Sequence, residues 1–405
     1  MTFWHTQPVC VSRCPNSAGR FGPSSEDLPS ECKRLVESSA STLPGELSHL
    51  QFETLHLREN GQHLDDVHRL LTDAFIGGTG TTLLLSQEAI LWHLCPPGYQ
   101  AEWHIGIRER NAGGALVAFL GGIPETVQLK NPAAPFRADA STRSEAITLS
   151  VCNATFLSVV PSLRGTHLVN YLMAKLFSRT WDHGGIKQIM FGTARRPFSP
   201  TTVGWTYSSP LFDRLNGGVT PPNVHIVNTF RLRPVEASDL TAIQGIVAAT
   251  EPHAVIRPGT WTEEYVSWRF FPRDGVLMSF ISAGRDAVIT FTQVVYRLNA
   301  GAAVSSPAFD TDLHVAVVHN CFCTNSEQFP ALLAEACRLL YRQHPHLAAV
   351  QIDDFAIRGG KEALREVGLR SGLSFTPELN SSAGLFMYNF SIDEVASSRC
   401  ILRLC

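Results

Sequence analysis

Apolar residues recur along this chain with two different periods, and each period predicts one type of element. Helical spacing predicts helices at residues 65–75, after the capping residue Ser86, and at 168–176, 329–343 and 361–367. Alternating or continuously apolar runs predict strands at 103–109, 115–121, 146–160, 187–193, 276–297, 314–323, 348–353 and 385–390. The first two of these strands form a hairpin, and the run at 276–297 is a pair of strands.

The predicted elements follow the same order twice. Each half contains a pair of strands, a long strand, a helix and a further strand, and the strand at 187–193 is expected to lie parallel to the one at 146–160. This order predicts a duplicated α/β domain with its junction near residues 228–236. Residues 11–48 are rich in Ser, Pro, Glu and Gly, so we expect them to form a loosely structured arm.

Composition and charge narrow the class of protein. A length of 405 residues exceeds the size at which a single core keeps growing, which favours two domains. The formal net charge of −3 argues against a nucleic-acid-binding surface. The first residues lack a basic start followed by a long apolar stretch, and the chain has no apolar run of about 18 residues, so neither a secretory leader nor a membrane span is expected. Its ten cysteines lack a regular spacing, which is typical of reduced thiols in a cytoplasmic protein.

One cysteine cluster invites comparison with a metal site. Cys321 and Cys323 share one face of a predicted strand, and His319 lies just before them. Such residues can bind zinc, but the chain has no second pair at a suitable distance. We therefore favour two core thiols and expect no metal site.

The stretch at residues 153–175 is the strongest candidate for chemistry. It predicts the end of a buried strand, a short turn at Arg164 and Gly165, and an amphipathic helix. The free N–H groups at the start of a helix, together with the helix dipole, favour anions. The turn therefore fits a diphosphate, as in the acyl-CoA site of GNAT-type acyltransferases, although any strand, turn and helix with one arginine would match. The turn at 324–328 has neither Gly nor Arg and contains an acid, so we expect the anionic ligand in the first half.

Several separated segments together resemble the eukaryotic N-myristoyltransferases. The segments are Phe-Trp-His-Thr-Gln-Pro-Val at 3–9, Leu-Trp-His-Leu-Cys-Pro-Pro-Gly-Tyr at 91–99, Glu-Trp-His-Ile-Gly-Ile-Arg at 102–108, Phe-Leu-Ser-Val at 156–159 with Leu-Arg at 163–164, and Tyr-Asn at 388–389. They occur in the family's order and span nearly the whole chain. The tail of sixteen residues after Asn389 also has the family's length.

The resemblance implies a duplicated GNAT-type fold. Its two pseudo-symmetric halves, residues 1–230 and 231–405, would form one saddle-like mixed sheet flanked by helices. The first half would bind acyl-CoA and the second would bind most of the peptide. The implied activity is that of a glycylpeptide N-tetradecanoyltransferase, a cytoplasmic monomer without a prosthetic group. It would transfer myristate from myristoyl-CoA to the N-terminal glycine of protein substrates.

The resemblance also assigns residues to the chemistry. The backbone amides of Phe156 and Leu157 would form an oxyanion hole, which requires a bulge in the strand that frees them. The terminal carboxylate of Cys405 would take the proton of the attacking amine, whose pKa of about 7.7–8.0 leaves much of it protonated at neutral pH. The Thr193 hydroxyl would hold the glycine amine, and Tyr207 would line the peptide groove. The residues implied in acyl-CoA binding are Thr2, Phe3, Trp4, Leu157, Ser158, Val159, Arg164, Gly165, Thr166, His167, Leu168 and Val169.

The chain departs from the family pattern at several places that bind ligands. The diphosphate turn, typically Arg-Ser-Lys-Arg, is Arg-Gly-Thr-His at 164–167, so two cations are replaced. The family's acidic loop corresponds to residues 76–82, which contain no acid and put a preference for basic peptides in doubt. The Tyr-Trp-His of the groove is Tyr-Ser-Ser at 207–209, and the late Gly-Asp-Gly is not recognisable near 379–383. Two alternatives therefore remain, a GNAT transferase for another acyl chain or amine, and a catalytically silent binding protein.

Overall fold

The computed structural model describes most of the chain between residues 43 and 352. It describes residues 43–74, 81–111, 113–130, 146–186, 188–193, 203–213, 229–250, 256–259, 261–298, 312–352 and 364, and strands at 22–23, 376–388 and 390–391. The helices are α2 (Gly61–Ala74), α3 (Gln87–Leu94), α4 (Leu168–Gly184), α5 (Leu240–Thr250), α6 (Glu263–Phe270) and α7 (Phe329–Gln343). The strands are β1 (Gly22–Pro23), β2 (Leu50–Thr54), β3 (Thr81–Leu84), β4 (His104–Glu109), β5 (Leu116–Lys130), β6 (Ala146–Val159), β7 (Ile189–Thr193), β8 (Val203–Asp213), β9 (Arg233–Pro234), β10 (Ile256–Pro258), β11 (Leu277–Ile281), β12 (Ala287–Leu298), β13 (Leu313–Cys323), β14 (Ala349–Gln351), β15 (Thr376–Tyr388) and β16 (Phe390–Ser391).

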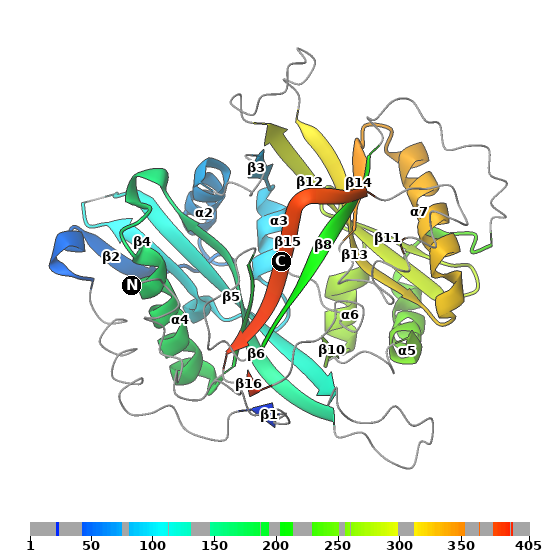
Figure 1. Ribbon diagram of the computed structural model, residues 1–405, viewed down its shortest axis with the longest axis horizontal. Coiled ribbons are helices and arrows are strands. Elements are labelled where there is room, and N and C mark those ends of the chain that lie inside the picture. The colour runs from blue at the N-terminus through cyan, green and yellow to red at the C-terminus, as the bar shows by residue number, and fades with distance from the viewer. Residues whose placement is uncertain are drawn as a thin grey trace.

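The main sheet has a pseudo-symmetric strand order. Its order is β2-β4-β5-β6-β7-β15-β8-β14-β13-β12-β11-β9, so the second half repeats the first in reverse from the other edge (Figure 1). Strands β6 and β7 pair in parallel, as the sequence predicted, and β13 pairs in parallel with β14 in the same way. The predicted duplication is therefore visible in the topology.

The two halves exchange strands reciprocally. Strand β15 of the second half pairs with β7 of the first, and β8 of the first half pairs with β14 of the second. A second exchange joins β3 to β12 and β10 to β5. Because each half completes the sheet of the other, we expect the two halves to unfold together. The predicted division at residues 230 and 231 falls between β8 and β9 and stays a prediction.

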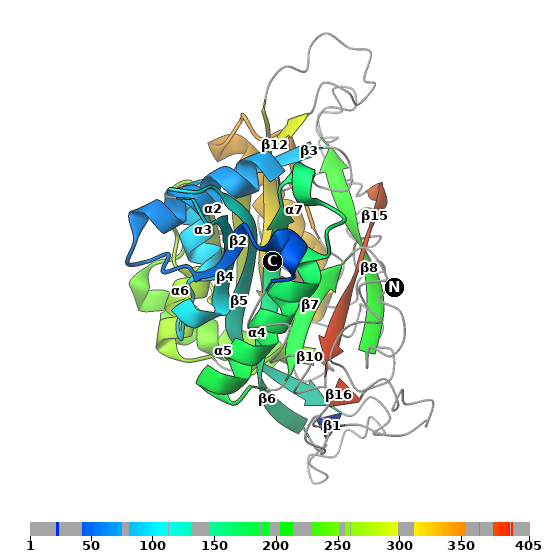
Figure 2. The same cartoon turned by 90° about the vertical axis from the view of Figure 1, so that its left-hand side faces the viewer.

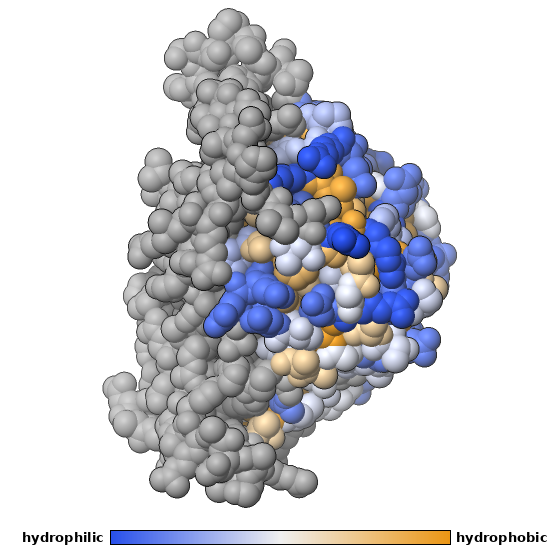
Figure 3. Space-filling model, turned by 90° about the vertical axis from the view of Figure 1, so that its right-hand side faces the viewer, coloured by the Kyte–Doolittle hydropathy of each residue, from blue (hydrophilic) through white to orange (hydrophobic). Residues whose placement is uncertain are grey.

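Helices cover both faces of each half of the sheet. In the first half, one core lies under α4 and the other lies under α2 and α3, as the two views of Figures 1 and 2 show. In the second half, α7 packs on one core, and α5 and α6 pack on another. The described part of the outer face of the second half mixes hydrophilic areas with smaller apolar ones (Figure 3). None of the helices in the described part of the chain has the length and apolar content needed to cross a bilayer.

A short internal repeat relates α3 to α6 and was missed by the sequence reasoning. Both helices have eight residues, and each is capped by a hydroxyl, Ser86 or Thr262, that accepts the N–H three residues later. Trp92 and Trp268 occupy the same position in the two helices and are 176 residues apart. A proline follows each helix at the second position beyond it. The repeat is a sequence signature of the duplication.

Most predicted elements agree with the structure to within a few residues. The structure confirms the helix at 329–343 and the strands at 146–160, 187–193 and 314–323. The last predicted strand, at 385–390, is part of the longer β15 and the short β16. Of the predicted helix at 361–367, only Leu364 is described, and it is helical. Of the predicted arm at 11–48, the structure describes β1, which pairs with β16, and residues 43–48.

Candidate functional site

Strand β6 contains a bulge near its end. Phe119 of β5 pairs with Ser158 of β6, and Gly121 pairs with Thr155. One residue of β5 therefore lies opposite two residues of β6. Bulges of this kind disrupt the hydrogen-bond ladder locally and redirect side chains next to functional sites. The two residues at the bulge are Phe156 and Leu157, the pair implied in the oxyanion hole.

The bulge forces an unusual backbone conformation. Phe156 has a φ of 53°, in the left-handed region that residues with a side chain rarely adopt. Such a conformation costs about 1–3 kcal/mol and persists only where packing determines it. Phe156 is 7% exposed and belongs to the core under α2 and α3, whereas Leu157 is 37% exposed. The pairing register between β5 and β6 passes over both residues.

The turn after β6 has the backbone geometry of an anion site. Gly165 has a φ of 86° and His167 a φ of 63°, and α4 begins directly afterwards at Leu168. Left-handed residues next to a helix start form a concave group of N–H donors. The Thr166 hydroxyl donates to the carbonyl of Leu163 at 2.6 Å and fixes the turn. Gly165 and His167 are exposed, so an anion has access from solvent.

Arg164 lies beside this turn, but its guanidinium binds main-chain carbonyls. Nε donates to the Val159 carbonyl at 3.2 Å, and Nη2 donates to the Ala74 carbonyl at 2.7 Å. Ala74 is the last residue of α2, 90 residues earlier in the chain. The side chain therefore ties the end of β6 to the end of α2, and its charge stays close to the turn.

The structure describes the other predicted site residues to different extents. Ser158 and Val159 are buried at the end of β6. Thr193 of β7 pairs with Gly384 of β15, and Tyr207 of β8 pairs with Ala383 of β15. Strand β15 therefore lies between two residues predicted to contact the substrate. The predictions for Thr2, Phe3, Trp4 and Cys405, and for residues 76–80 of the loop at 76–82, fall on residues outside the described part of the chain.

The cysteine cluster belongs to the core. Cys321 and Cys323 are 7% and 3% exposed, and burial raises the pKa of both thiols. No group of three or more potential ligands capable of holding a metal ion occurs among the described residues. The favoured interpretation as core thiols agrees with this burial.

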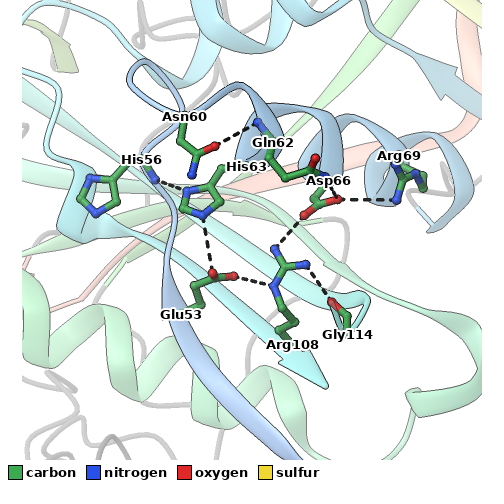
Figure 4. Close-up of polar contacts among 9 residues, drawn as sticks. All are labelled: Glu53, His56, Asn60, Gln62, His63, Asp66, Arg69, Arg108 and Gly114. Carbon is green, nitrogen blue, oxygen red and sulfur yellow. Dashed lines mark hydrogen bonds and ion pairs between the residues drawn. The ribbon is translucent and has the colours of Figure 1, made fainter. Parts of the chain in front are cut away.

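A polar network holds the outer strands of the first half to α2. Nε of Arg108 donates to Glu53 at 2.8 Å, and Nη2 donates to the buried Asp66 at 2.8 Å (Figure 4). His63 of α2 accepts the main-chain N–H of His56 at 3.0 Å and approaches Glu53 to 3.5 Å. Arg108 ends one of the segments that resemble the family, and its role here is to hold β4, β2 and α2 together.

The two halves meet where α3 faces α6, and sequence reasoning did not find this contact. The Trp92 indole donates to the Trp268 carbonyl at 3.0 Å, and the Trp268 indole donates to the Trp92 carbonyl at 3.2 Å. The rings stack with centroids 5.4 Å apart. An open pocket of about 430 Å³ lies beside the two rings, also lined by Arg58 and Arg273. Among the described residues that line it, none is a predicted site residue.

The palindromic sheet, the bulge in β6 and the turn before α4 define the class of protein, a duplicated GNAT-type fold. Structural comparison agrees with this class. Two structures of Saccharomyces cerevisiae N-myristoyltransferase with bound myristoyl-CoA superpose with a TM-score of 0.74 at 16% identity. The first match covers 98% of this chain and 89% of that chain, and the second covers 97% and 93%.

Sequence comparison finds similarity to one family over part of the chain. The family described as "Myristoyl-CoA:protein N-myristoyltransferase, N-terminal domain" matches residues 30–203. The glycylpeptide N-tetradecanoyltransferase of Candida albicans is 24% identical over 312 residues, 71% of this chain and 63% of that protein. That of Eremothecium gossypii is 33% identical over 131 residues, 32% of this chain and 26% of that protein. The chain is thus similar to the N-myristoyltransferases in sequence over residues 30–203 and in fold over nearly its whole length, and it spans less than two thirds of the length of these relatives.

Proposed function

We propose that the protein transfers a myristoyl group from myristoyl-CoA to the N-terminal glycine amine of protein substrates. The observation that carries the proposal is the bulge at Phe156 and Leu157, followed within eight residues by the exposed turn at Gly165. An acyl-CoA has a thioester and a diphosphate. The bulge suits the thioester, and the turn suits the diphosphate. The proposed enzyme needs no prosthetic group and no covalent intermediate.

The bulge is the proposed oxyanion hole. As the amine attacks, the thioester oxygen gains negative charge, and N–H donors aimed at it stabilise the transition state. The left-handed Phe156 turns the following peptide, which carries the Leu157 N–H, away from the ladder direction. Removing one such donor typically lowers the rate by about 10²–10³. Leu157, Ser158 and Val159 would line the thioester end.

The turn and the start of α4 are the proposed diphosphate site. The main-chain N–H groups of Gly165, His167, Leu168 and Val169 would bind the phosphate oxygens, assisted by the helix dipole, and the Thr166 N–H would join them on leaving its long bond of 3.4 Å to the Leu163 carbonyl. Arg164 would contribute its nearby charge while holding the turn against α2. Thr2, Phe3 and Trp4 would cover the cofactor, as the family resemblance implies.

The attacking amine must lose a proton, and we assign that proton to the terminal carboxylate of Cys405. The Thr193 hydroxyl would hold the amine, and Tyr207, on the other side of β15, would contact the peptide. These assignments follow from the family resemblance, with support from the pairing of Thr193 and Tyr207 opposite neighbouring residues of β15. We also propose that the enzyme acts as a monomer in the cytoplasm, which light scattering and cell fractionation will test.

One experiment tests the proposal. The pure protein is incubated with myristoyl-CoA or acetyl-CoA and a panel of N-terminal-glycine peptides, and product masses are measured. Myristoyl transfer is the expected result. Acetyl transfer alone would identify a different GNAT transferase, and binding of myristoyl-CoA without turnover would identify a silent binding protein.

A truncation tests the proposed base. Deleting Leu404 and Cys405 moves the terminal carboxylate, so turnover should be lost while myristoyl-CoA affinity stays the same. Full activity in the truncated protein would exclude the terminal carboxylate as the base. A Cys405→Ser variant is the control, because it keeps the carboxylate and should retain full activity.

A further inference from the structure

Helix α3 touches a bulge in each half of the molecule. In the second half, Thr290 pairs with Asn320 and Phe291 pairs with Val318, which leaves His319 of β13 as an extra residue. This bulge corresponds in the topology to the one in β6. Two consecutive residues of α3 reach the two bulges, because the Trp92 ring lies 4.9 Å from His319 and the His93 ring lies 5.7 Å from Phe156. Both contacts have an edge-to-face geometry, with interplanar angles of 62° and 65°.

The position of α3 depends on the second half. An isolated helix of eight residues is not stable in water, so packing must hold α3 in place. Trp268 of α6 supplies both a stacked ring and one of the two reciprocal hydrogen bonds to Trp92. Helix α6 is itself anchored beside the second bulge, where Nε of Arg269 donates to the Asn320 side chain at 2.8 Å.

The contact between His93 and Phe156 has a consequence for the bulge in β6. A residue with a side chain does not favour the left-handed conformation, so Phe156 holds its φ of 53° because its ring is confined. His93 packs edge-on against that ring and forms part of the confinement. A shift of α3 would free the ring, and the peptide leading to Leu157 would then rotate.

We propose that Trp268 is a positioning residue for the bulge at Phe156 and Leu157, acting through Trp92 and His93. Ring centroids link the four aromatic residues in steps of 5.4, 4.8 and 5.7 Å. The series runs from α6 in the second half to β6 in the first. The proposal rests on the proposed function, because it assigns Trp268 to the alignment of the donor that receives the developing charge.

The test compares two Trp→Phe variants. Trp268→Phe removes the indole donor to α3 and shortens the stacked ring. Trp261→Phe is the matched control, because Trp261 packs against Phe270 and Phe322 and is separated from Trp268 by the ring of Tyr265. We expect kcat of Trp268→Phe to fall by about tenfold with an unchanged KM for myristoyl-CoA, since small misplacements of catalytic groups have effects of this size or larger. Trp261→Phe should keep the kcat of the natural protein.

A second pair of variants tests the link to the bulge itself. His93→Ala should lower kcat as Trp268→Phe does, and His93→Phe, which restores an aromatic edge, should recover most of the activity. A purely structural role of His93 would lower thermal stability in both variants without this difference in kcat. Normal kcat in Trp268→Phe or in His93→Ala would overturn the proposal.

A measurement independent of turnover separates this proposal from the proposed function. In protein labelled with ¹⁵N-leucine, the amide signal of Leu157 reports the orientation of its peptide. We expect Trp268→Phe and His93→Ala to shift this signal, and Trp261→Phe to leave it unchanged. An inactive natural protein would overturn the proposed function, while the Leu157 signal would still report the alignment. An unshifted signal in Trp268→Phe would overturn the positioning role.

Discussion

Arg164 lies beside the proposed diphosphate site, yet its side chain bonds to two carbonyls of the protein. The informative change is Arg164→Met, which keeps most of the aliphatic side chain and removes both hydrogen bonds. The carbonyls concerned belong to Val159 and Ala74, which are 9% and 3% exposed. Replacement should therefore weaken the attachment of β6 to α2 more than it weakens ligand binding.

The size of each effect can be worked out from these contacts. A hydrogen bond from a charged donor contributes about 1.5–3 kcal/mol when buried. The Arg164 side chain is exposed overall, so we expect a loss of about 1–2 kcal/mol for the two bonds together. In a chain of this length that loss lowers Tm by about 1–4 °C. A charge about 4 Å from a phosphate in water contributes about 1 kcal/mol, so the affinity for CoA should fall by about fivefold.

Calorimetric unfolding and titration with myristoyl-CoA measure the two effects. Arg164→Lys is the control, because it keeps the charge but cannot reach both carbonyls with the same fork of donors. We expect the Tm of Arg164→Lys to fall as much as that of Arg164→Met, while its affinity for myristoyl-CoA stays unchanged. A fall in affinity of about a hundredfold in Arg164→Met, corresponding to about 2.7 kcal/mol, with an unchanged Tm would refute this reasoning.

Three further predictions concern stability. Burial lowers the pKa of His104 to about 4, whereas the pKa of histidine in the unfolded chain is about 6.5. The contribution of neutral His104 to the free energy of unfolding is therefore complete above pH 6.5 and is lost as the pH falls towards 4, because the unfolded chain then binds the proton more readily. Urea unfolding should thus show a loss of about 2 kcal/mol between pH 7 and pH 5 that His104→Phe lacks. Buried Glu335 accepts two main-chain N–H groups at 3.0 Å, so Glu335→Gln, with one acceptor oxygen, should lose about 1.5–3 kcal/mol in urea unfolding. Arg108→Met leaves the buried Asp66 with the more distant and exposed Arg69, at 3.5 Å, as its cation and should cost at most about 3 kcal/mol, and adding Asp66→Asn should recover part of it.

Local signals in the sequence predicted those elements that local chemistry determines. The Ser86 cap predicted the start of α3, and the spacing of apolar residues predicted both ends of α7. The exchange of strands between the halves was not predictable in this way. The partners β15 and β7 are far apart in the sequence, and their pairing depends on the whole sheet.

Strand β5 shows why one prediction was wrong. The hairpin strand was expected to end at residue 121, because glycines and a proline break strand patterns. In the structure β5 continues to Lys130. A Cβ at Gly121 would lie 2.6 Å from Leu94 of α3, and one at Gly122 would lie 2.8 Å from Leu176 of α4. The adjacent glycines allow close approach of a helix on each face, which periodicity alone does not reveal.

Some features of the candidate site could likewise be predicted from the sequence, and others could not. The turn at Gly165 was predictable from sequence, because glycine before an amphipathic helix indicates a left-handed residue. The partner of Arg164 was not predictable, because Ala74 comes from a helix 90 residues earlier. The contact between Trp92 and Trp268 could have been predicted from the sequence. The capping hydroxyl, the tryptophan and the proline of α3 all recur in α6 at the same offset of 176 residues.

The turns of the two halves differ, and this difference supports the proposal that the anion binds in the first half. Both halves keep the bulge, but the turn before α7 differs from the turn before α4. The side chain of Asn325 accepts the Glu327 N–H at 3.1 Å, its carbonyl accepts the Gln328 N–H at 3.0 Å, and Pro330 in the first turn has no N–H to offer. The carboxylate of Glu327 also repels anions. With the donors used internally, the second bulge packs His319 against Trp92 instead. In this chain, the second copy of the site supports the first.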